Sequence, residues 1–195
     1  MASSYGKAAL WAGIHLFLLL SMITPFGMLA VHIMIVPLIV LFTVTSRTAA
    51  LVGYAAAALI PVAFLGGAGL FVTLLSLFYA LPAVAMARQY RRQTGAGMAV
   101  IAGIVSMIAV MLLALLLTFA LDYNFTAFLT ETLENDKLLM TTIGSMFGSE
   151  ADAGQIIDIL ISLIPLTLIF IAVYTAVLGH WLARRLLTGF WRDVP

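Results

Sequence analysis

Long uncharged runs of apolar residues dominate this chain, and they constrain its fold more than any other feature. Each run approaches the roughly 20 apolar residues that a helix needs to cross a lipid bilayer. Across the 195 residues, 64% are hydrophobic and only 9% are charged, whereas soluble domains carry about 25% charged residues. Too little polar surface remains to cover so much apolar material in water. The sequence therefore predicts an all-α integral membrane protein.

Short segments with turn and helix-breaking chemistry divide the apolar runs. These segments read "TPFG", "TSRT", "GGAG" and "RQYRRQTGAG", and glycine, proline and small polar residues are typical of turns. The sequence predicts one domain, 1–195, with six transmembrane helices at about 8–24, 26–45, 48–65, 68–87, 97–121 and 155–186. The first is expected to be a retained helix, because "SMITPFG" after it offers no signal-peptide cleavage site.

The distribution of charges along the chain predicts its orientation. With a cytoplasmic N-terminus, eight basic residues lie inside, and only Lys137 lies outside. The inner set is Lys7, Arg47, Arg88, Arg91, Arg92, Arg184, Arg185 and Arg192. Cytoplasmic loops are enriched in lysine and arginine, so we expect a multi-pass protein of the cell inner membrane with both termini cytoplasmic. A net charge of +1, without a basic stripe among aromatics, gives no indication of nucleic-acid binding.

The sizeable outer loop, 122–153, carries apolar residues at roughly helical spacing with polar residues between them. This pattern predicts an amphipathic extracytoplasmic segment between the fifth and sixth helices. One interpretation is a connector lying on the membrane surface. The other is a lid over a site that opens outward.

Small residues recur at four-residue spacing in several predicted helices. The pairs are Ala8 with Ala12, Ala9 with Gly13, Gly53 with Ala57, and Ala99 with Gly103. Such pairs let membrane helices approach closely. Pro37, Pro61, Pro82 and Pro165 lie inside predicted helices, where each leaves a carbonyl without its partner and can bend the helix.

Two histidines, His15 and His32, lie within the first two predicted helices. At 1.5 Å per residue, both sit roughly 9–14 Å below the outer surface, on helices joined by a short turn. Ionisable residues at this depth commonly mark a ligand site, but a neutral imidazole also hydrogen-bonds neighbouring helices together. Both interpretations stay open. Two histidines are too few for the three or four ligands that a metal site needs.

Asp158 is the one carboxylate that enters a predicted helix, and Ser162 shares its face. It is interpreted either as an acid at a helix start or as part of an outer cavity with the histidines. The chain contains no H-E-x-x-H, no G-x-S-x-G and no glycine-rich phosphate loop. We therefore expect neither an enzyme nor a cofactor, and energy for transport would come from a partner or a gradient.

Two stretches carry a resemblance to a known family. One is "VPLIVLFTVTSRTAALVGYAAAALIPVAFLGGAGLF" and the other is "QIIDILISLIPLTLIFIAVYTAVLGHWLARRLL". Together, over about Pro37 to Leu187, they resemble the YybS-like family of bacterial membrane proteins, which is similar to the S components of energy-coupling-factor transporters. That resemblance implies a small-molecule site facing outward and a partnership with an energising membrane subunit and ATPases. It also implies a partner interface at Ala8 and Ala12.

Two functional hypotheses follow from these patterns. The first is a small-molecule-binding membrane subunit of a transporter, with ligand-binding His15, His32, Asp158 and Ser162 in the outer half of the bundle. The second is a non-transporting scaffold that docks other membrane proteins through its small-residue helix faces, alone or as a homo-oligomer. In the scaffold, the histidines are hydrogen bonds between helices.

Overall fold

The computed structural model describes residues 3–120 and 153–190, together with the single residues 127 and 131. Nearly all of these residues are helical, and no strand occurs among them. This confirms the all-α class. The expected amphipathic segment, 122–153, lies almost wholly outside the described residues. The helices are α1 (Ser4–Ser21), α2 (Gly27–Ile33), α3 (Ile35–Val44), α4 (Arg47–Arg92), α5 (Ala96–Ala120) and α8 (Ala153–Phe190).

The chain divides into two compact units. The first unit comprises residues 1–110 and 171–195, and therefore contains α1 to α4, the first part of α5 and the last part of α8. The second unit comprises residues 111–170. Within the first unit, α1 packs against α3 and α4, and α3 also packs against α4. The fully buried side chains of α3, among them Leu38, Ile39 and Leu41, form its core.

The expected helix at 26–45 is divided into α2 and α3, which corrects the prediction of one continuous helix. The division falls at Met34, three residues before Pro37, because α2 ends at Ile33 and α3 begins at Ile35. Proline has no backbone N–H, so Pro37 cannot donate to the carbonyl of Ile33 as a helical residue would. Met34 between the two helices keeps helical backbone angles (φ −58°, ψ −31°), so the chain continues in nearly the same direction.

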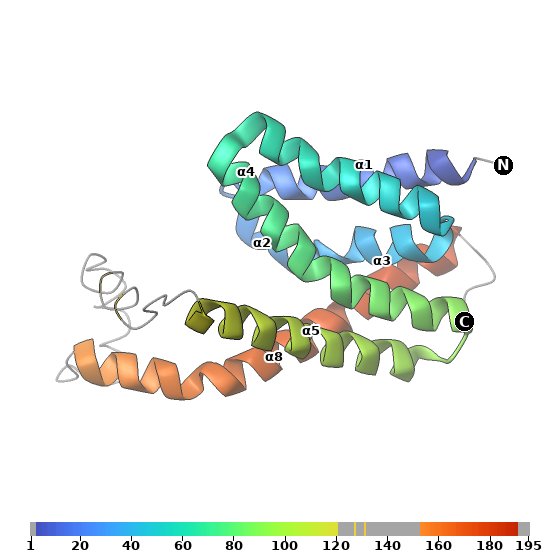
Figure 1. Ribbon diagram of the computed structural model, residues 1–195. Coiled ribbons are helices and arrows are strands. Elements are labelled where there is room, and N and C mark those ends of the chain that lie inside the picture. Colours follow the sequence, from blue (N-terminus) through green and yellow to red (C-terminus); the bar gives the residue numbers. More distant parts are fainter. Residues whose placement is uncertain (1–2, 121–126, 128–130, 132–152, 191–195) are drawn as a thin grey trace. The chain divides into compact units, whose positions relative to one another are not determined.

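Helix α4 is a hairpin of two helical arms. Gly66 has non-helical backbone angles (φ 56°, ψ −124°), and the chain doubles back there, as the teal and green ribbon in Figure 1 shows. Thr73 Oγ1 in the second arm donates to the carbonyl of Ala58 in the first arm, at 2.6 Å. The arms correspond to the expected helices at 48–65 and 68–87, and the reversal falls within the predicted "GGAG" turn.

Within the described residues, three helices are long and apolar enough to cross a membrane: Arg47–Arg92, Ala96–Thr118 and Ile161–Gly189. A shorter apolar segment, Leu29–Val44, comprises most of α2 and all of α3. Many large apolar side chains of these helices point outward, including Phe64, Leu116 and Phe170, which are 80%, 65% and 67% exposed. Outward apolar surface of this extent suits contact with lipid rather than with water.

Glycines and alanines bring the helices of the first unit together. A Cβ at Gly103 would lie 2.8 Å from Met86 Sδ of α4 and 3.0 Å from Ala176 Cβ of α8. A Cβ at Gly179 would lie 2.8 Å from Ile35 Cγ2 of α3. The predicted close approach of helices at small residues is thus confirmed at Gly103, because a side chain there would press on Met86 and Ala176.

Candidate functional site

His15 is completely buried in the first unit, where it joins α1 to the second arm of α4. Its Nε2 lies 2.8 Å from Ser76 Oγ in a buried hydrogen bond, and the exposed fraction of both residues is 0%. The other ring nitrogen, Nδ1, is buried without a hydrogen bond of normal geometry, although the backbone of Met34 interacts with the ring. His15 therefore lies inside the bundle, away from its surface.

Tyr54 extends this polar cluster to the first arm of α4. Ser76 Oγ donates to Tyr54 OH at 3.4 Å, and the Tyr54 ring lies 6.2 Å from the His15 ring. The Tyr54 ring also lies 6.0 Å from Phe42 in α3. Because these residues come from α1, α3 and both arms of α4, the cluster holds these four segments in one arrangement. We refer to His15, Ser76, Tyr54 and Phe42 as the core cluster.

His32 has different surroundings from His15. Its side chain is exposed, and its ring meets the Tyr174 ring edge-on, with the ring centres 5.5 Å apart. The structure thus gives the two histidines separate partners, one inside the bundle and one on its surface. Of the two, His32 is the imidazole that remains accessible to another molecule.

Asp158 and Ser162 belong to the second unit. Both side chains are exposed, and Ser162 Oγ donates to the carbonyl of Ile159 at 2.7 Å. They lie four residues apart on α8, so they share a face of that helix, as the sequence predicted. Their assignment to a ligand site stays a prediction.

Ala8 and Ala12 pack within the chain. Their exposed fractions are 2% and 7%, and a Cβ at Gly53 would lie 3.3 Å from Ala12 Cβ and 3.5 Å from Ala8 Cβ. The interface with a partner that the resemblance implied at these two residues stays a prediction, because the contact described for them is with the first arm of α4.

A groove of about 450 Å³ runs beside this contact, between α1 and the first arm of α4. We call it the small-residue groove. Its lining is almost wholly apolar and includes Ala9, Gly13 and Ala56, which are exposed. Nothing lies within 4 Å of the position that a Cβ would take at Gly13. The pair Ala9 and Gly13 therefore faces outward, unlike the pair Ala8 and Ala12.

The structure adds functional candidates that sequence reasoning missed. Ser76 and Tyr54 were not singled out, although each is a polar residue in an apolar run. Tyr90 OH lies 2.5 Å from His180 Nδ1, and their rings are stacked with centres 5.8 Å apart.

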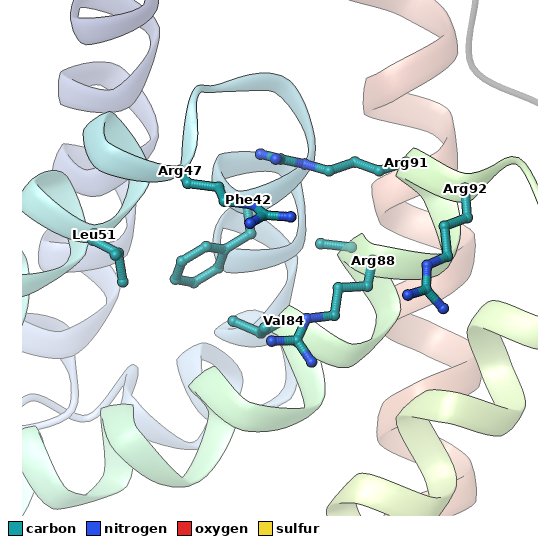
Figure 2. Close-up of a pocket in the computed structure, with 8 residues that line it drawn as sticks. Phe42, Arg47, Leu51, Val84, Arg88, Arg91 and Arg92 are labelled. Atoms are coloured by element: carbon teal, nitrogen blue, oxygen red, sulfur yellow. The ribbon is translucent and has the colours of Figure 1, made fainter.

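A pocket of about 410 Å³, shown in Figure 2, is a further candidate. The residues that line it are Phe42, Arg47, Leu51, Val84, Ala87, Arg88, Arg91 and Arg92. These arginines were used only to orient the chain.

A comparison with known families identifies one match. The family model described as a predicted membrane protein (DUF2232) covers residues 13–195. No curated protein and no solved structure matches the chain. The match confirms the prediction of a membrane protein. The finer resemblance to YybS-like proteins and to S components stays a prediction.

Proposed function

The chain belongs to the DUF2232 family of predicted membrane proteins, and we propose that it is an interaction subunit that docks another membrane protein. The observation that carries this proposal is the small-residue groove. The exposed residues Ala9, Gly13 and Ala56 line it, so a foreign helix can approach closely there. Close packing of small residues is a main source of affinity between helices in lipid, where the hydrophobic effect gives none.

The burial of His15 also favours docking over ligand binding. The imidazole is held by Ser76 inside the bundle, which is the arrangement expected for a hydrogen bond that joins helices. The partner in this proposal is a transmembrane helix of a different protein. In the resemblance to S components, that partner is the energising membrane subunit.

The proposed topology has six crossings of the inner membrane. They are α1, α2 continued by α3, the two arms of α4, α5 and α8, with both termini cytoplasmic.

The orientation can be tested with single introduced cysteines, because the chain contains no cysteine of its own. We expect Pro25→Cys, between α1 and α2, to react with a membrane-impermeant maleimide in intact cells, and Thr94→Cys, between α4 and α5, to react only after the membrane is opened. The reverse pattern would contradict this orientation.

Filling the small-residue groove is expected to release the partner. Ala56→Leu places a larger side chain in the groove, whereas Ala55→Leu adds the same bulk at an exposed neighbour outside its lining. Overpacking costs about 1–3 kcal/mol, so we expect Ala56→Leu to weaken the complex by about tenfold or more, and Ala55→Leu to leave it intact. Native mass spectrometry of the gently extracted protein measures the fraction in complex.

The same measurement identifies what is bound. Equal loss of complex in both variants, or a complex made only of copies of this chain, would contradict the docking of a different protein at the groove. Unchanged thermal unfolding of both variants serves as the control for folding, because both positions are exposed.

A second candidate is a small-molecule-binding transporter subunit similar to S components. The exposure of His32, Asp158 and Ser162 favours it, because these polar side chains on apolar helices are accessible to a ligand. His15 would then support the fold rather than touch the ligand. In the mass spectra, a retained small molecule would favour this candidate, whereas a complex of proteins alone would favour the scaffold.

A further inference from the structure

Four arginines meet in one pocket of the first unit, which we call the arginine pocket. Arg47, Arg88, Arg91 and Arg92 line it, with Phe42, Leu51, Val84 and Ala87 as the apolar part of its lining. Figure 2 shows the guanidinium ends of Arg47 and Arg91 on the same side of Phe42. Its volume of about 410 Å³ lies within the range of small-molecule sites.

The reversal of α4 at Gly66 builds this pocket. Arg47 is the first residue of α4, and Arg91 and Arg92 lie in its last turn, so the hairpin brings both ends of the helix to the same place. Ser46 N–H donates to Ser4 Oγ at 2.8 Å, which fixes the start of α4 against α1. Arg91 Nη2 donates to the carbonyl of Thr45. The arginine side chains therefore extend from an ordered backbone.

No acidic side chain among the described residues of the first unit balances the charges of the pocket. The first acidic residue along the chain is Asp122, and the described residues of the first unit, 3–110 and 171–190, include no aspartate or glutamate. Arg47 and Arg91 are close enough for their charges to repel each other. Holding like charges together costs free energy, and a bound anion would offset that cost.

The place of the pocket in the fold points to the class of anion. The pocket lies at the ends of apolar helices, beside the connection from α3 to α4. In the proposed topology this is the cytoplasmic end of the bundle, where lipid head groups meet a membrane protein. Guanidinium groups bind phosphate oxygens with two parallel hydrogen bonds. Phe42, Leu51 and Val84 add the apolar surface that an acyl chain requires, and basic pockets between membrane helices are known to bind phosphorylated head groups.

We propose that the arginine pocket binds the phosphate group of an anionic phospholipid from the surrounding leaflet. Arg47 and Arg88 hold the phosphate from opposite arms of α4. Arg91 is anchored on Thr45 and adds positive charge. The apolar lining holds the adjoining part of the lipid. This site is separate from the small-residue groove, so the proposal does not depend on the docking of a partner.

The test compares lipid binding by the full chain and by two charge-matched double variants. Each protein is placed in phosphatidylcholine nanodiscs with a minor fraction of phosphatidylglycerol, and native mass spectrometry measures the lipid retained after release. We expect the wild-type chain to enrich phosphatidylglycerol, and Arg47→Gln with Arg88→Gln to lower this enrichment by about tenfold or more. Arg184→Gln with Arg185→Gln removes the same amount of charge outside the pocket, so this variant should still enrich phosphatidylglycerol.

Two results would overturn the proposal. Equal loss of phosphatidylglycerol in both double variants would show attraction to net charge rather than a site. Inorganic phosphate that binds as tightly as the lipid, and displaces it, would show a site for a free anion. Should the first double variant fail to fold, Arg88→Gln against Arg184→Gln gives the same comparison, because Arg88 and Arg184 are both exposed.

Discussion

Gly69→Ala is expected to prevent the two arms of α4 from closing against each other. A Cβ at this position would lie 2.0 Å from the carbonyl oxygen of Pro61 and 2.4 Å from its carbonyl carbon. Both atoms belong to the backbone of the opposite arm, so no side-chain rotation relieves the overlap. We expect a loss of more than about 3 kcal/mol in the free energy of unfolding, measured by thermal or denaturant unfolding in detergent.

Gly67→Ala is the matched control for this change. Nothing lies within 4 Å of the position that its Cβ would take, and the residue is exposed in the same turn. Alanine restricts the unfolded chain more than glycine does, so stability should be unchanged or raised by about 0.4–1 kcal/mol. If Gly69→Ala unfolds at the same temperature as Gly67→Ala, the two arms of α4 do not approach as closely at Gly69 and Pro61 as described.

The sequence predicted much of this fold because its signals are local. "GGAG" marked the reversal of α4, since glycine tolerates the positive φ of 56° that Gly66 adopts. The division at Met34, before Pro37, was not predicted, although a bend in the helix at this proline was. Pro61, Pro82 and Pro165 remain inside helices, and their patterns in the sequence do not differ from that of Pro37.

The candidate site was harder to predict because its contacts join distant segments. His15 stood out as a polar residue in an apolar helix, but its partner Ser76 is 61 residues away. His15 and His32 lie on consecutive helices, yet they have different partners, Ser76 and Tyr174. The arginines predicted only the orientation of the chain. Whether they line one pocket depends on the register of the α4 hairpin, which no local pattern specifies.

Removing the core cluster hydrogen bond is expected to destabilise the protein strongly. His15→Ala leaves a cavity where the exposed fraction is 0%, and it leaves Ser76 without its partner at 2.8 Å. Buried large-to-small changes cost about 2–5 kcal/mol, and we expect a loss in this range from unfolding measurements in detergent. His32→Ala, at an exposed position, should change stability by less than about 0.5 kcal/mol.

A double-mutant cycle separates the hydrogen bond from the cavity. Ser76→Ala alone removes the hydroxyl and leaves the imidazole unpaired, while the double variant His15→Ala with Ser76→Ala leaves neither partner behind. If the bond joins α1 to α4 as we infer, the two changes should couple by about 0.6–1.7 kcal/mol, which spans the average and the maximum for hydrogen bonds between membrane helices. Strictly additive losses would mean that His15 stabilises the bundle through packing alone. A large loss of stability on His32→Ala, with little on His15→Ala, would reverse the roles assigned to the two histidines.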